Sequence, residues 1–124
     1  MLMADQLPAE TLTSKQMATL SVALKLDGDY TAEDIKELVV RGDCQAWPWK
    51  ESIAITEIRV FPRQRALNVW LASGKMEDIL ALEPFVIDFA KANGCTKLTL
   101  TGRTGWDRAL KHWNRKTITM TRSL

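Results

Sequence analysis

The sequence predicts a single α/β domain built around a mixed β-sheet. Residues 65–101 follow a strand, turn, helix, strand pattern, and two strands joined through a helix normally run parallel. Two β-like segments precede this unit, and short turns between them predict antiparallel pairing. The chain has 124 residues, 46% of them hydrophobic and 26% charged, which suits one globular domain with its own core.

The central strand is predicted at residues 65–72. Leu67, Val69 and Leu71 alternate with Ala66, Trp70 and Ala72, so both faces are largely apolar. A strand of this kind is covered on both sides.

A helix and a further strand follow the central strand. Residues 73–75 form a turn, helical spacing begins at Met76, and Gly94 ends the helix. Pro84 lies inside this segment and predicts a break near Glu83, because proline is costly inside a helix. Residues 96–101 predict the strand that pairs in parallel with the central one.

Two helices are expected before the sheet. Thr13 with Gln16 and Thr31 with Asp34 have the spacing of capping boxes, which start helices. We expect residues 1–30 to form an N-terminal arm and helix, and residues 31–124 to form the main domain.

Two antiparallel strands are predicted at residues 44–49 and 52–61. The apolar residues of the second strand change phase between Ile55 and Ile58, which predicts a bulge near Thr56 and Glu57. After the parallel strand, a helix is expected at residues 104–113 and a last strand at residues 116–121.

Composition excludes several classes of protein. No apolar run approaches the ~20 residues of a membrane span, and no signal peptide is recognisable. Cys44 and Cys95 are expected to be buried, reduced thiols, which suits a reducing compartment. With His112 as the single histidine, a His-rich metal site is excluded, and we expect no metal site.

The net charge of +2 conceals an asymmetry. Residues 1–40 contain seven acids and three bases, whereas residues 101–124 contain six bases and one acid. This basic C-terminal region could serve nucleic acid or another anionic partner. The alternative is a solvated helix and edge strand.

The element order resembles the GNAT fold of N-acetyltransferases over about residues 31–124. Local sequences resemble a group of small GNAT-like proteins encoded by tailed bacteriophages. They are residues 56–58, 61–63, 69–74 and 93–95, the ending 116–124, and above all the Gly-Arg-Thr-Gly-Trp element at 102–106. Some phage GNAT-like proteins are virion components, so the resemblance implies a virion protein or an acetyltransferase.

In active members of the family, acetyl-CoA lies along the central strand and its pyrophosphate meets the start of the next helix. The resemblance therefore implies cofactor-binding positions in this strand and turn, with Arg103 beside them as an anion ligand or a brace for its own turn. The strand and turn positions are Val69, Leu71, Ser73, Gly74 and Lys75.

The turn departs from the family's Arg/Gln-x-x-Gly-x-Gly/Ala pattern. Only Gly74 and the nearby Lys75 remain of it, and Glu77 and Asp78 would repel a pyrophosphate. The family's usual acid, a tyrosine on the last helix, is also missing, because the single tyrosine is Tyr30.

Glu57 is the candidate catalytic base, with a surface carboxylate as the alternative reading. We expect His112 to be an exposed side chain and Cys95 a core side chain. Trp106 is a core residue or a platform for a ligand.

These residues support two hypotheses. The first is a phage GNAT-fold protein that has lost catalysis and acts through protein contacts, with virion components or with itself, in the virion or the host cytoplasm. The second is an acetyl-CoA-dependent N-acetyltransferase. No membrane association is expected.

Overall fold

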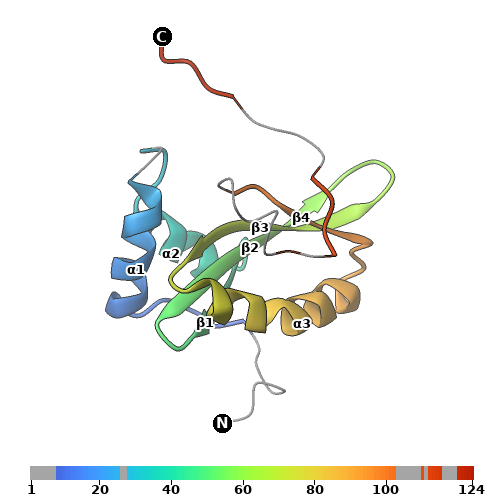
Figure 1. Cartoon of the computed structure of the whole chain (residues 1–124), viewed down its shortest axis with the longest axis horizontal. Coiled ribbons are helices and arrows are strands. Elements are labelled where there is room, and N and C mark those ends of the chain that lie inside the picture. Colours follow the sequence, from blue (N-terminus) through green and yellow to red (C-terminus); the bar gives the residue numbers. More distant parts are fainter. Residues whose placement is uncertain (1–7, 26–27, 103–109, 111, 116–119) are drawn as a thin grey trace.

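The computed structural model describes residues 8–25, 28–102, 110, 112–115 and 120–124. Four strands form one sheet in the order β1-β2-β3-β4 (Figure 1). Their bounds are Gln45–Trp49 for β1, Ser52–Val60 for β2, Arg65–Ser73 for β3 and Lys97–Leu100 for β4. The first three strands are antiparallel, and β4 is parallel to β3, so the predicted mixed sheet is confirmed.

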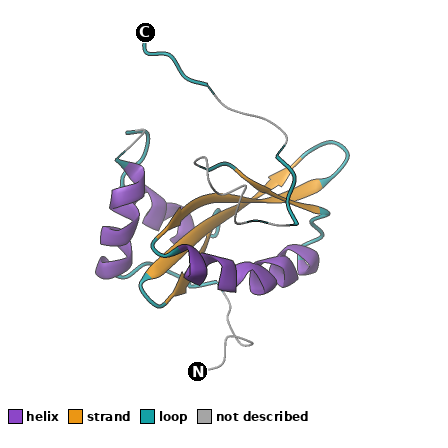
Figure 2. Ribbon diagram, viewed as in Figure 1, coloured by secondary structure: helices purple, strands orange, loops and turns teal. Residues whose placement is uncertain are grey.

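Helices cover both faces of this sheet (Figure 2). They are α1 at Ser14–Leu24, α2 at Ala32–Val40 and α3 at Met76–Ala92. The first core cluster lies between α1, α2 and the sheet, and includes Leu20, Ile35 and Ile55. The second lies under α3 on the other face and includes Trp47, Leu67 and Leu82. The flanking helices of the predicted fold are therefore present.

Both predicted capping boxes are present. The Thr13 hydroxyl accepts a hydrogen bond from the Gln16 N–H, and the Gln16 side chain accepts one from the Thr13 N–H. Thr31 and Asp34 make the same reciprocal pair at α2. These bonds satisfy backbone donors that a helix leaves free at its start.

The N-terminal segment packs on the same core as the rest of the chain. Leu20 of α1 is fully buried, and Ser73 at the end of β3 donates a hydrogen bond to the Thr19 carbonyl at 2.8 Å. Before α1, Ala9 forms an isolated antiparallel bridge with Ala46 of β1.

The expected break in α3 is wrong. The helix runs without interruption from Met76 to Ala92, with Pro84 inside it and exposed. Leu82 and Val86 on either side of the proline are both buried under the sheet. Burial of residues before and after Pro84 stabilises the continuous helix, although the low helix propensity of proline would favour a break there.

The expected bulge near Thr56 is present, but it lies on the partner strand. The pairing register shifts between Ile55 and Thr56, and the extra residue is Trp70 on β3. Strand β2 needs no change of phase, because Ile55 enters the core cluster of α1 and α2 while Ile58 packs against that of α3. The bulge instead moves Leu71 to the opposite face from Leu67, contrary to the alternation expected for β3.

The C-terminal elements expected at 104–113 and 116–121 fall largely outside the described residues. Leu110 and residues 112–115 are neither helix nor strand, and the same holds for residues 120–124. Both cysteines are free and buried, as expected. Among the described helices, none combines the length and hydropathy needed to cross a bilayer.

Candidate functional site

The turn between β3 and α3 is very short. Strand β3 ends at Ser73 and α3 begins at Met76, so Gly74 and Lys75 alone connect them. Gly74 has a φ of +116°, a conformation that L side chains rarely adopt. A Cβ added to it would lie 2.2 Å from Ser52 Oγ, so the turn passes directly against β2.

Ser52 and Asp78 form hydrogen bonds at the start of α3, on its buried side. The Lys75 N–H donates to Ser52 Oγ at 2.8 Å, and Ser52 Oγ donates to Asp78 Oδ2 at 2.8 Å. Ser52 is 2% exposed and Asp78 4% exposed. The chain therefore places its own carboxylate beside the end of the helix that attracts anions.

Among the described strands, only β2 pairs with the second half of β3, so that its other side is open there. Strand β4 pairs with β3 only from Ala66 to Val69, and it ends at Leu100. Leu71, Ala72 and Ser73 pair with β2 alone, and Trp70 is the extra residue of the bulge. The pairing of β3 with β4 thus ends at Val69, four residues before the end of β3.

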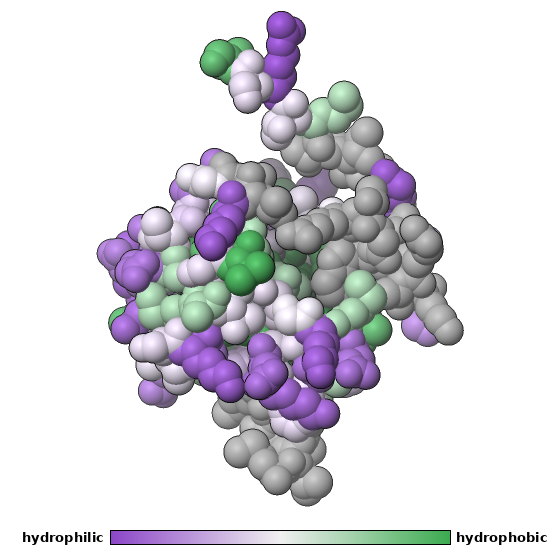
Figure 3. All heavy atoms as spheres, turned by 60° about the vertical axis from the view of Figure 1, so that its left-hand side comes forward, coloured by the Kyte–Doolittle hydropathy of each residue, from purple (hydrophilic) through white to green (hydrophobic). Residues whose placement is uncertain are grey.

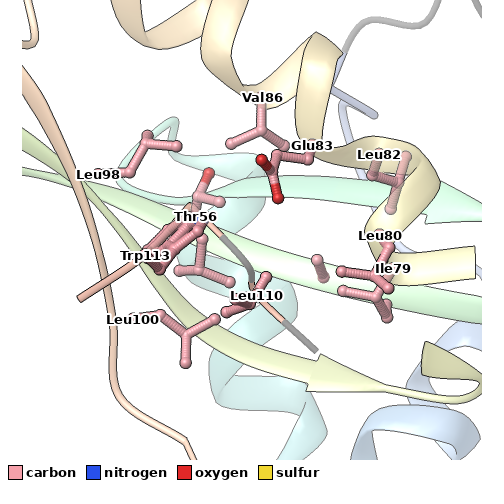
Figure 4. A pocket seen from close by; sticks show the side chains of 12 residues that line it. Thr56, Ile79, Leu80, Leu82, Glu83, Val86, Leu98, Leu100, Leu110 and Trp113 are labelled. Carbon is pink, nitrogen blue, oxygen red and sulfur yellow. The ribbon is translucent and has the colours of Figure 1, made fainter. Parts of the chain in front are cut away.

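An apolar pocket of about 40 Å³ lies between α3 and the sheet near this point. Figure 4 shows Leu110 and Trp113 of the C-terminal region facing Thr56, Leu98 and Leu100 across it. Of the described residues that line it, Glu83 of α3 alone is ionisable. This volume is enough for a few water molecules.

A row of polar side chains crosses the three strands β2, β3 and β4. Asn68 Nδ2 donates to Glu57 Oε2 at 2.9 Å, and Thr99 Oγ1 donates to Asn68 Oδ1 at 2.8 Å. Asn68 is only 4% exposed and Glu57 is half-buried. The candidate base Glu57 is therefore held by a buried amide, which fixes its orientation.

Cys44 precedes β1, and its buried position changes its chemistry. Burial, followed by the negative charges of Glu57 and Asp43, raises the pKa of the Cys44 thiol to about 11. A thiol with so high a pKa is mostly protonated at neutral pH and is a poor nucleophile.

The remaining predicted site residues are dispersed. His112 is exposed and Cys95 is buried in the core cluster under α3, as expected for both. Arg103 and Trp106 lie outside the described residues. Tyr30 packs edge-on against Trp70, with ring centroids 4.8 Å apart. No group of three or more metal-binding side chains occurs in the described ranges.

The strand and turn positions expected to bind a cofactor are split by the pairing. Val69 lies in the stretch paired with both β2 and β4, whereas Leu71 and Ser73 lie in the open stretch. Gly74 and Lys75 form the turn itself.

Sequence reasoning missed the roles of Ser52 and Asn68. Each lies on a strand far in sequence from its partner: Ser52 bonds to a residue 26 positions away, and Asn68 to one 31 positions away. The only available signal was a polar residue inside an apolar strand.

Among protein-family models, curated protein sequences and solved structures, only solved structures are similar to this chain. No protein-family model and no curated protein sequence matches the chain. Among solved structures, an acetyltransferase of Trypanosoma brucei is similar with a TM-score of 0.67 and 12% identity, over 92% of this chain and 96% of that one.

Two further acetyltransferases are similar at comparable coverage. Glucosamine-6-phosphate N-acetyltransferase of Arabidopsis thaliana has a TM-score of 0.61 and 16% identity, over 91% of this chain and 95% of its own. Ribosomal-protein-alanine N-acetyltransferase of Brucella melitensis has a TM-score of 0.57 and 14% identity, over 86% of this chain and 91% of its own. Identities this low establish the fold alone, and the fold of this chain is that of the GNAT acetyltransferases.

Proposed function

We propose that this chain is a tailed-phage GNAT-fold protein that no longer transfers acetyl groups and acts through protein contacts, in or on the virion. The phage assignment rests on the sequence resemblance given above. The loss of catalysis rests on one observation: Asp78 places a buried carboxylate at the start of α3, where a pyrophosphate would bind, and Ser52, to which it is hydrogen-bonded, takes up the Lys75 N–H.

The electrostatics of this place oppose a phosphate ligand. A helix start attracts anions through its free N–H groups and its positive dipole end. Here Asp78 supplies a buried negative charge and Glu77 adds an exposed one in the same turn. The Lys75 N–H, which could bind phosphate, is already paired with Ser52. The residues present therefore do not fit the pyrophosphate of acetyl-CoA.

The shortness of the turn supports the same conclusion. A cradle for two phosphates needs several backbone N–H groups that point at the ligand. The two residues Gly74 and Lys75 provide little such backbone, and the Lys75 N–H is already bonded to Ser52.

Protein contact is supported by apolar side chains on the outer surface. Val22 of α1 is 66% exposed and Val40 of α2 is 60% exposed. Figure 3 brings the side of α1 and α2 forward and shows apolar surface bordered by hydrophilic side chains. Exposed apolar side chains with a polar border are typical of protein interaction sites.

Proteomic analysis of purified particles of the encoding phage tests this proposal. We expect the chain in the particles at a fixed ratio to a structural protein, retained after a high-salt wash. Abundant chain in the infected-cell lysate with none in the washed particles would contradict a virion role.

The second candidate is an acetyl-CoA-dependent N-acetyltransferase. The open edge of β3 after Val69 and the orientation of Glu57 by Asn68 favour it. If this candidate is right, Glu57 is the base and acetyl-CoA lies along the open edge. Binding of acetyl-CoA distinguishes the two proposals.

A further inference from the structure

The hairpin that joins β2 to β3 extends beyond its neighbouring strands. Strand β1 pairs with β2 only as far as Thr56, and β4 pairs with β3 only from Ala66. Residues 57–65, called the ribbon below, therefore have no β1 beside them. Strand β4 still flanks the β3 residues that pair with Glu57, Ile58 and Arg59, so only the tip at residues 60–65 is two-stranded. Figure 1 shows this hairpin at the side of the sheet away from α1 and α2. The Phe61 N–H donates to the Gln64 carbonyl at 2.8 Å and closes its tip.

This end of the molecule carries a net positive charge. Residues 57–66 and residues 88–99 beside them contain five bases, Arg59, Arg63, Arg65, Lys91 and Lys97, against two acids, Glu57 and Asp88. Glu57 accepts a hydrogen bond from Asn68. All five bases are exposed. The ion pairs found among the described residues involve Lys15 and Arg41, and none involves this cluster.

The charges lie on both faces of the ribbon. Ile58 and Leu67 pack against the cluster under α3, so strand alternation directs Arg59 to the opposite face and Arg65 to the same face as Leu67. At the tip, Phe61 is 43% exposed, and Lys97 Nζ lies 5.6 Å from the centre of its ring.

The base of the ribbon is fixed to the body of the protein. The Thr96 N–H donates to the Arg65 carbonyl at 2.9 Å, and Thr96 Oγ1 bonds to Gln64 Oε1 at 3.2 Å. A hairpin backbone held in this way loses less entropy on binding.

We propose that the β2–β3 hairpin binds double-stranded DNA, with its tip at residues 60–65 in the major groove and its arginines on the phosphates at both sides. The major groove is about 12 Å wide and admits a two-stranded ribbon. Positive charge on both faces matches the two phosphate backbones that border the groove. Arginine also suits phosphate because its guanidinium donates two parallel hydrogen bonds. A flat acidic protein surface would meet only one of the two faces.

Fluorescence anisotropy with a short labelled DNA duplex of mixed sequence tests the proposal. The wild-type chain is expected to bind, with an affinity that falls steeply between about 50 and about 200 mM salt. The variant Arg59→Glu/Arg63→Glu should raise Kd at least about tenfold and reduce the salt slope by about 2, because it removes two phosphate contacts.

The matched control is Lys25→Glu/Lys36→Glu, which makes the same change in net charge at exposed positions of the helical side. It should leave Kd within about twofold of wild type, since those lysines lie outside the hairpin. Equal weakening by both variants would assign binding to net charge and overturn the proposal. So would absence of binding at low salt, or equally tight binding of polyglutamate, which would indicate an acidic protein partner. Unchanged melting temperatures ensure that the variants are folded.

Discussion

Gly74 satisfies two requirements that no other residue type meets at once. Its φ is +116°, and the side where a Cβ would stand is filled by Ser52, with Oγ at 2.2 Å and Cα at 2.7 Å. The Ser52 backbone cannot move away without disturbing β2, since Ser52 pairs with Trp49 of β1. The tight approach that closes the start of α3 therefore depends on the glycine.

Gly74→Ala is expected to reduce the free energy of unfolding by about 2–4 kcal/mol, from backbone strain and overpacking together. Gly42→Ala is the control, because Gly42 has a φ of +84° but nothing within 4 Å of its added Cβ. The Gly42→Ala variant should lose only about 1 kcal/mol of unfolding free energy, because backbone strain is the only penalty there. Urea denaturation measures both, and equal losses would show that contact with Ser52 is unimportant.

The Cys44 thiol makes stability depend on pH in the alkaline range. Its pKa rises from the ordinary 9.0 to about 11 in the fold, mainly through burial. Below pH 9 the thiol is protonated in both states and its full contribution is present. Between pH 9 and 11 the unfolded chain ionises first, so stability falls.

The variant Cys44→Ala should reduce the decrease in the free energy of unfolding between pH 9 and 11, whatever its effect on stability at neutral pH. The measurement is the free energy of unfolding at several pH values from 8 to 11 for both proteins, taking the difference in slope. Parallel curves would mean that Cys44 is not protected from ionisation by the fold.

The helix α3 shows how packing overrides local sequence. Pro84 removes one backbone hydrogen bond and is unfavourable relative to alanine by about 3 kcal/mol in a helix interior. The helix persists because Ile79, Leu82 and Val86 are buried against the sheet.

Pro84→Ala is therefore expected to stabilise the protein by about 1–3 kcal/mol, since Pro84 is exposed and makes no core contact that would be lost. Thermal unfolding followed by circular dichroism gives the change. An unaltered or lower melting temperature would indicate that the backbone geometry at Pro84 is itself needed for packing.

Elements with local signals were predictable from the sequence. The capping boxes of α1 and α2, the start of α3 at Met76 and the central strand, predicted at 65–72 and observed at 65–73, all follow from residue spacing and turn chemistry. The bulge near Thr56 was assigned to β2 rather than to β3, because alternation within one strand does not reveal which of the two paired strands holds the extra residue.

The candidate site was predictable only in part, for the same reason. The sequence identified the turn at Gly74 and the anionic start of α3. It did not reveal that Ser52 links that turn to Asp78, or that Asn68 orients Glu57, because these bonds join different elements.

The whole domain includes the N-terminal helix in its core. Leu12, Leu20 and Leu24 are 4%, 0% and 9% exposed and belong to the core cluster that α1 and α2 share with the sheet. Each buried leucine contributes about 1.5–3 kcal/mol, so their sum approaches the total stability of a typical domain, about 5–15 kcal/mol.

A chain reduced to residues 31–124 is therefore expected not to fold cooperatively. Near-ultraviolet circular dichroism and a urea titration, with the full chain as reference, test this expectation. A cooperative transition with native-like spectra would show that residues 1–30 are an appendage of an independent domain.

The central claim concerns the whole molecule: a GNAT fold is retained, but the start of α3 carries the chain's own Asp78 carboxylate and the Lys75 N–H is bonded to Ser52, so the cofactor's pyrophosphate does not bind there. Calorimetric titration of the full-length protein with acetyl-CoA tests it most directly. We expect no measurable heat up to millimolar ligand, because Asp78 places a buried carboxylate at the start of α3 and Ser52 takes up the Lys75 N–H. Saturable binding with a micromolar Kd would contradict the claim and favour an active acetyltransferase.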